Sequence, residues 1–137
     1  MTVMDASVLV SVYHVPDAFH QPSVGWLHQH IRSGAIIVAP LLILSEVGGA
    51  IARQTTDPQQ GHQAVLQLRA LPNLFLVPFD ERLANLSAQL AADLRLKGAD
   101  AVYVAVAAQL GLPLMTWDRE QIERGGRLVT AQRPDGS

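Results

Sequence analysis

Four acidic residues stand out because each interrupts an otherwise apolar stretch of the chain. They are Asp5, Glu46, Asp100 and Asp118. An ionised carboxylate is costly to bury without a partner, and no Lys or Arg lies within four residues of Asp5 or Glu46. A divalent cation would neutralise such groups, and a cation held by carboxylates beside water is a hydrolytic centre. We therefore treat the four acids as candidate metal ligands and catalytic residues.

Their positions along the chain predict that the four acids share one crevice. Asp5 and Asp118 each follow a short apolar run typical of a strand, and open parallel sheets bind ligands beyond the carboxyl ends of their strands. Asp100 opens a helical stretch, where the helix dipole favours an anion. Glu46 lies about two turns into another expected helix and can reach inward if that helix borders the same crevice.

Three of these residues also have a purely structural interpretation. Asp118 begins the sequence Asp-Arg-Glu-Gln, which is a capping box. Asp100 can be a simple first-turn charge, and Glu46 can reach solvent or pair with Arg53. Asp5 has no such explanation, because an unpaired carboxylate at the end of a buried strand gains nothing. One shared site explains all four better than four separate coincidences.

The elements that must position these residues alternate between short apolar runs and longer helical patterns. We expect strands at residues 2–4, 35–39, 74–77, 113–116 and 127–130. We expect helices at 6–14, 23–31 with Ser23 as the N-cap, 40–54 with Pro40 in the first turn, 58–70, 81–96, 99–110 and 119–123. Strands separated by helices imply an α/β fold whose mostly parallel sheet of four to five strands is covered on both faces.

Composition bounds the classes of protein that remain. The 137 residues are 49% hydrophobic and 16% charged, which predicts one folded domain over residues 1–131 and a flexible tail over 132–137. The absence of Cys excludes disulfides, zinc–thiolate sites and cysteine nucleophiles. We find no signal peptide and no apolar stretch of roughly 18 residues. We therefore expect a soluble, cytoplasmic protein with no membrane association.

The net charge of −2 does not by itself predict a polyanionic partner. Setting aside the four candidate acids, however, leaves eight of the twelve acidic residues against ten Lys and Arg residues. Arg is well suited to contacting phosphate through two hydrogen bonds. Arg53 and Arg119 are the candidates for weak substrate-phosphate contacts.

Taken in order, the acidic motifs resemble those of the PIN-domain nucleases, and in particular the short VapC-type toxins of prokaryotic toxin–antitoxin pairs. The motifs are Val-Met-Asp5-Ala-Ser, Leu-Ser-Glu46-Val, Gly-Ala-Asp100-Ala-Val-Tyr and Met-Thr116-Trp-Asp118. Each motif is short, but their order and spacing cover nearly the whole chain. The resemblance implies a PIN-like three-layer fold.

The resemblance also implies an activity and its residues. The implied enzyme is an endoribonuclease that uses Mg²⁺ or Mn²⁺ to hydrolyse RNA phosphodiesters. Asp5 and Asp100 become the best candidates for metal ligands, and Asp118 would complete the metal shell directly or through water. Glu46 would hold a second cation or orient the attacking water. Ser7 and Thr116 are similar to the hydroxyl residues that hydrogen-bond the acids or the bound phosphate.

The partners implied by the resemblance are an RNA substrate, a cognate antitoxin that covers the acidic crevice, and a second copy of the chain in a homodimer. Apolar residues at Val24, Leu27 and Ile31, or the Gly48-Gly49 pair, are candidate surfaces for the protein partners.

Two other functions remain open at this point. The domain can be a non-catalytic nucleic-acid-binding module, or one whose acids hold a structural cation. It can also be a phosphotransfer domain, although such a domain needs a Lys at a strand end and the sole Lys, Lys97, follows an expected helix.

Overall fold

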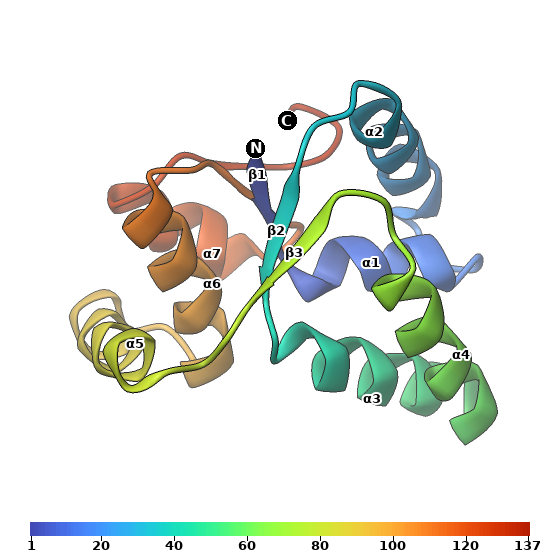
Figure 1. Cartoon of the computed structure of the whole chain (residues 1–137), viewed down its shortest axis with the longest axis horizontal. Coiled ribbons are helices and arrows are strands. Elements are labelled where there is room, and N and C mark those ends of the chain that lie inside the picture. Colours follow the sequence, from blue (N-terminus) through green and yellow to red (C-terminus); the bar gives the residue numbers. More distant parts are fainter.

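The computed structural model describes all residues from 1 to 137, and its centre is a parallel β-sheet between two layers of helices (Figure 1). The strand order is β3-β2-β1-β4-β5, and every neighbouring pair is parallel. The strands are β1 (Thr2–Met4), β2 (Ile37–Pro40), β3 (Leu74–Val77), β4 (Leu114–Met115) and β5 (Ala131–Gln132). The expected α/β fold with a parallel sheet is therefore confirmed.

The helices divide between the two sides of the sheet, with α1 to α4 on one side and α5 to α7 on the other (Figure 1). Their bounds are α1 (Ala6–Tyr13), α2 (His20–Arg32), α3 (Ile43–Thr55), α4 (Pro58–Arg69), α5 (Glu81–Leu94), α6 (Gly98–Leu110) and α7 (Arg119–Glu123), followed by a 3₁₀ turn at Gly125–Arg127. None of these helices combines the length and the apolar character that crossing a lipid bilayer requires.

Helix α6 forms the centre of the core on its side of the sheet. All seven residues from Ala101 to Ala107 are buried, and the helix packs against β1, β2 and β4. Small Ala and β-branched Val side chains allow this close approach from every direction. Asp100, which precedes this buried run, is therefore attached to one of the most firmly packed elements of the protein.

Two helix beginnings differ from the sequence-based prediction. Helix α2 begins at His20, and Ser23 is not its N-cap but a fully buried residue within it. Phe19 precedes the helix and makes no side-chain cap, so the sequence carries no capping signal there. Pro40 is the last residue of β2, paired with Val77, and does not belong to a helix. As a result Glu46 lies in the first turn of α3.

The fifth strand also lies later than predicted. Residues 127–130 were expected to form it, but the strand comprises Ala131 and Gln132. It joins the sheet through hydrogen bonds from Leu114 N to Thr130 O and from Thr116 N to Gln132 O. A strand of two residues is too short to leave an alternating pattern. Gln132, expected in the tail, is part of the sheet.

Gly48 of α3 and Gly61 of α4 allow close packing between the two helices. A Cβ atom at Gly61 of α4 would lie 2.6 Å from the carbonyl oxygen of Gly48, and one at Gly48 would lie 2.9 Å from Val65 Cγ2. Gly48 therefore serves contacts within the chain. Leu27 is buried in the core and offers no free surface to a partner, whereas Gly48, Val24 and Ile31 are half-buried.

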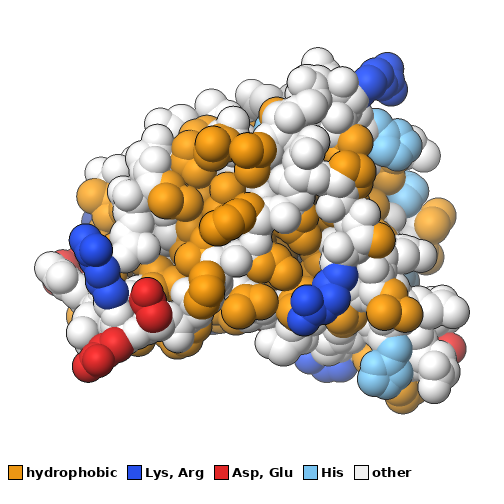
Figure 2. Space-filling model, viewed as in Figure 1, with side chains coloured by type: hydrophobic (Ala, Val, Ile, Leu, Met, Phe, Trp, Pro, Cys, Tyr) orange, Lys and Arg blue, Asp and Glu red, His pale blue; other side chains and the backbone are white.

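Exposed apolar side chains gather instead over the edge strand β3. Figure 2 shows hydrophobic atoms across the middle of the face on which β3 lies. Met1, Ile36, Phe75 and Leu110 are all exposed there and line a hollow of about 410 Å³. An apolar area of this kind on the surface of a folded domain is typical of an interaction surface.

Candidate active site

Asp5 is held at the carboxyl end of β1 by three hydrogen-bond donors. Its Oδ2 accepts from the backbone N of Ser7 at 3.1 Å and from Thr116 Oγ1 at 3.0 Å. Its Oδ1 accepts from Gln121 Nε2 at 3.0 Å. The contact with Ser7 makes Asp5 the N-cap of α1. Asp5 is 5% exposed, and the hydrogen bonds from these donors stabilise its charged form despite the burial.

Asp100 lies beside Asp5, as the shared-crevice hypothesis predicted. Its Oδ1 accepts a hydrogen bond of 3.1 Å from Gln121 Nε2, the same nitrogen that donates to Asp5. Two carboxylates that contact one amide nitrogen lie within reach of a common ion. The two acids therefore share one site although they belong to β1 and α6.

Asp118 is the N-cap of α7. Its Oδ1 accepts from the backbone N of Gln121 at 2.9 Å, and its own N donates to Thr116 Oγ1 at 2.9 Å. Only one half of the expected capping box forms, because the Gln121 side chain turns to Asp5 and Asp100. The structural interpretation of Asp118 is thus correct, and it also anchors this acid next to the other two.

Glu46 enters the site from α3 and is held by Tyr103 of α6. Tyr103 Oη donates to Glu46 Oε1 at 2.6 Å. The only salt bridge in the structure joins Arg124 to Glu120, so Glu46 does not pair with Arg53. Tyr103 was not singled out from the sequence, although its position three residues after Asp100 places both on one helix face.

The pKa values show that the acids act on one another. Burial, together with the charges of Asp118 and Asp5, raises the pKa of Asp100 to about 6, against the lowering effect of the Gln121 hydrogen bond. Burial also raises the pKa of Glu46, with Asp5 adding to the rise and Tyr103 opposing it. Clustered carboxylates are expected to shift in this direction. The four acids therefore form one electrostatic group.

Gln121 is a second site residue, besides Tyr103, that sequence reasoning missed. It is fully buried, and its Nε2 bridges two carboxylates, while its Oε1 has no hydrogen-bond partner. A buried polar atom left unpaired costs about 1–3 kcal/mol. Its place at the end of the capping-box sequence concealed this role. The sequence signal that could have revealed Gln121 is its position one helical turn after Asp118, which places it next to a candidate site acid.

The donor chemistry of the site fits a hard divalent cation. All the ligand atoms that the acids and hydroxyls supply are oxygens, which Mg²⁺ and Mn²⁺ prefer. No three acidic or His residues lie close enough to form a complete ligand set by themselves. Asp5 and Asp100 are the two carboxylates that one donor joins, so their oxygens lie together at the centre of this oxygen-rich site.

Ser7 and Thr116 form a small hydroxyl network behind the acids. Thr116 is fully buried and contacts both Asp5 and the backbone of Asp118. Ser7 Oγ accepts from the backbone N of Trp117 at 3.0 Å and lies 3.4 Å from Thr116 Oγ1. These contacts fix the strand end that carries Asp118 against the start of α1.

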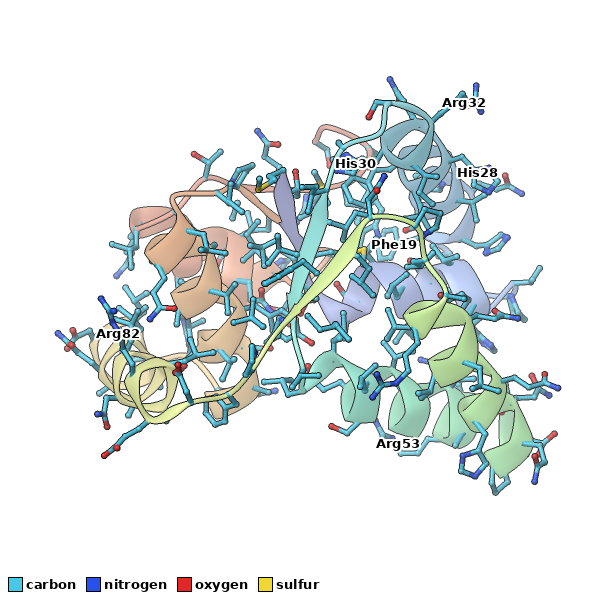
Figure 3. The ribbon with its side chains drawn as sticks, viewed as in Figure 1. Phe19, His28, His30, Arg32, Arg53 and Arg82 are labelled. Atoms are coloured by element: carbon cyan, nitrogen blue, oxygen red, sulfur yellow. The ribbon has the colours of Figure 1, made fainter.

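The two candidate phosphate-binding residues lie on the elements that carry Glu46 and Asp118. Arg53 belongs to the last turn of α3 (Figure 3), and its Nη1 lies 3.2 Å from where a Cβ atom of Gly49 would be. Its side chain therefore folds back along the helix toward the turn of Glu46. Arg119 is exposed at the start of α7, directly after Asp118.

The His and Trp residues lie apart from the acids or serve packing. His28 and His30 lie on α2, and the figure places them away from α5 and α6 (Figure 3). The ring of His30 stacks on Trp26 with centroids 4.8 Å apart. Trp117 stacks on Phe19 at 4.1 Å, and its Nε1 donates to Ser23 Oγ at 2.7 Å.

A hollow of about 520 Å³ opens beside Glu46. Helices α3, α5 and α6 and the segment before α5 contribute to it. The lining residues include Leu42, Ser45, Glu46, Phe79, Ala84, Ala88, Ala91 and Ala99. This surface joins the acidic site to a largely apolar groove.

The sequence model of the PIN domain matches residues 2–127 of the chain. No match was found among curated protein sequences. Solved structures are similar at low sequence identity. FitAcB from Neisseria gonorrhoeae shares 21% identity with a TM-score of 0.73, and the match covers 98% of each chain.

Two further structures show the same architecture. VapC20 from Mycobacterium tuberculosis, described as a sarcin–ricin-loop-cleaving toxin, shares 16% identity with a TM-score of 0.69 over 87% of this chain and 91% of its own. A toxin–antitoxin complex from Klebsiella pneumoniae shares 16% identity with a TM-score of 0.67 over 98% of each chain. At these identities the likeness establishes the fold.

Proposed function

Because the chain belongs to the PIN-domain family, a family of nucleases, we propose that it is an endoribonuclease dependent on Mg²⁺ or Mn²⁺. The observation that carries the proposal is the meeting of Asp5 and Asp100 on one amide nitrogen, with Asp118 and Glu46 in the same electrostatic group. Such a concentration of carboxylates fits cation-assisted hydrolysis of a phosphodiester better than it fits phosphotransfer or a purely structural cation.

Each residue has a distinct role in the proposed reaction. A bound divalent cation lowers the pKa of water and stabilises the charge that develops on the phosphate. Asp5 and Asp100 would hold the cation, with Asp118 as a further carboxylate beside them. Glu46, whose pKa is raised by burial, orients the attacking water and accepts its proton. Thr116 and Ser7 keep Asp5 and the Asp118 segment in place.

Substrate contacts follow from the edges of the site. Arg53 and Arg119 are proposed to bind phosphates on either side of the scissile bond, since neither forms an ion pair within the protein. RNA is the proposed substrate because the structurally similar VapC20 is described as a toxin that cleaves the sarcin–ricin loop.

The proposed biological context is a toxin–antitoxin pair in the cytoplasm. The structural similarity to a toxin–antitoxin complex supports an antitoxin partner. The hollow beside Glu46 offers such a partner an apolar groove that leads to the acids. The exposed apolar side chains over β3 (Figure 2) support a homodimer as a further proposal.

Substitution of the two central acids tests the function. Asp5→Asn and Asp100→Asn should each lower cleavage of a fluorescent RNA about 100-fold or more, and EDTA should abolish the wild-type activity. Asn preserves the cap of α1 because it caps helices as well as Asp does, so circular dichroism should report an intact fold. Persistent cleavage in EDTA or in both variants would refute the proposal. A wild-type protein that binds Mn²⁺ but cleaves no RNA would favour a non-catalytic module.

A further inference from the structure

The Gln121 amide requires an explanation beyond packing. The side chain is fully buried and its Oε1 accepts no hydrogen bond. A Met or Leu side chain would fill a similar volume without leaving an oxygen unpaired. What distinguishes Gln from these residues here is its NH₂ group, which donates to Asp5 at 3.0 Å and to Asp100 at 3.1 Å. What Gln contributes at this position is therefore the two N–H donors of its side-chain amide.

We propose that Gln121 is a positioning residue whose amide holds Asp5 and Asp100 in register so that one divalent cation can bind both. This inference rests on the proposed metal-dependent function. Two like charges at short range repel, and an amide that donates to both offsets that repulsion. The metal-free protein thus keeps its two principal ligands together.

The hydrogen bonds leave room for a cation. Each carboxylate oxygen can accept two hydrogen bonds or ligand contacts. Asp5 Oδ2 is fully used by Ser7 N and Thr116 Oγ1, whereas Asp5 Oδ1 and Asp100 Oδ1 each receive only the Gln121 donor. The remaining lone pairs of these oxygens stay available, so the amide orients the two acids without saturating them.

Helix α7 gives Gln121 a fixed position from which to act. The backbone N of Gln121 donates to Asp118 Oδ1 at 2.9 Å. One residue therefore contacts three of the four acids, one through its backbone and two through its side chain. The short helix α7 thus connects the carboxyl ends of β1 and β4 with the first turn of α6.

The test compares Gln121→Met with a matched Gln→Met control. Met keeps the length and the packing volume but removes both donors. Gln89 is exposed on α5, and Gln89→Met provides the control. Binding of Mn²⁺ to each full-length protein is measured by the electron paramagnetic resonance signal of free Mn²⁺ at constant pH. We expect Gln121→Met to bind Mn²⁺ about 10–100-fold more weakly and Gln89→Met to bind as the wild type does.

Two outcomes would overturn the proposal without touching the function. Unchanged affinity would mean that Gln121 has only a structural role, and tighter binding would mean that the amide competes with the cation. Failure of the wild-type protein to bind Mn²⁺ would overturn both this inference and the proposed metal-dependent function. The three results are distinct because wild type and variants are titrated together.

A second measurement keeps the inference testable if Gln121→Met does not fold. In the wild-type protein, the side-chain amide resonances of Gln121 are followed by nuclear magnetic resonance during titration with Mg²⁺. We expect them to shift in step with Mg²⁺ binding, because the amide shares its acceptors with the ion. Resonances that stay unchanged at saturation would overturn the proposal.

Discussion

At the scale of single residues, Asp100 should make the stability of the metal-free protein depend on pH. Its pKa is raised to about 6 from an ordinary value of 3.8, so between these values the folded state binds more protons than the unfolded state. Its contribution to the free energy of unfolding therefore falls as the pH rises through this window. Above pH 7 Asp100 is ionised in both states, and the full loss of unfolding free energy that its burial causes is present.

Asp100→Asn should remove this cost. We expect the variant to be more stable than wild type by about 1 kcal/mol at pH 7.5, after allowing for solvent screening of a partly exposed group, and nearly equal to it at pH 4. Urea unfolding in EDTA at both pH values measures the difference. Asp93→Asn, at an exposed position on α5, controls for the loss of a negative charge. Parallel pH profiles for wild type and Asp100→Asn would contradict the argument.

The hydrogen bond between Tyr103 and Glu46 yields a second prediction. Tyr103→Phe removes the 2.6 Å bond to Glu46, so the pKa of Glu46 should rise further and the free energy of unfolding should fall by about 1–2 kcal/mol. Tyr13 supplies a matched control, since its buried hydroxyl has no partner. Tyr13→Phe should be neutral or stabilising by urea unfolding. Equal losses in both variants would show that the Glu46 contact adds nothing.

The residues of the site differ in how readily the sequence reveals them. The four acids were found because single charges within apolar runs are costly unless they serve a purpose. Gln121 and Tyr103 were missed because both residue types are ordinary in helices. Their roles depend on which acids lie across the cleft, and that information belongs to the tertiary structure.

At the scale of elements, the contact between α3 and α4 depends on Gly61. Gly61→Ala should destabilise the protein by about 1–3 kcal/mol, because its Cβ would lie 2.6 Å from the backbone oxygen of Gly48. Gly49→Ala is the matched control, since its new Cβ would meet only the flexible end of Arg53. That variant should gain up to about 1 kcal/mol from helix propensity. Thermal and urea unfolding compare the two, and equal effects would refute the close-contact argument.

Elements with strong periodicity were predicted to within a few residues. Helices α4, α5, α6 and α7 and strands β1 and β3 lie where the apolar pattern placed them. The errors arose where no local signal exists. Helix α2 begins without a capping side chain, and β5 is held only by pairing with β4. Both depend on contacts with distant parts of the chain.

At the scale of the whole molecule, a net charge of −2 predicts a weak dependence of RNA binding on salt. If only Arg53 and Arg119 contact phosphates, the slope of log affinity against log salt should be about −1.4, or about 0.7 per contact on a single strand. Arg53→Ala should lower the magnitude of this slope by about 0.7. Arg82→Ala on α5, distant from Arg53 in Figure 3, should leave it unchanged.

Fluorescence anisotropy with the Asp5→Asn variant in EDTA measures this slope without cleavage. A slope that is equally steep in the Arg53→Ala variant would exclude Arg53 as a phosphate contact.

The overall architecture was predictable because alternating strands and helices permit few arrangements. The order β3-β2-β1-β4-β5 was not predicted, since β1 pairs both with β2, the next strand in sequence, and with β4, which lies near the other end of the chain.

The indole of Trp117 gives this protein an optical reporter of its own. Phe19 and Ser23 hold the ring in place, and the same residue is joined by a peptide bond to Asp118. Trp26 is the only other source of indole emission, so a Trp26→Phe background would isolate one fluorophore beside the acids. Occupancy of the cleft by an ion, a nucleotide or an inhibitory peptide could then be followed in real time without attaching a dye.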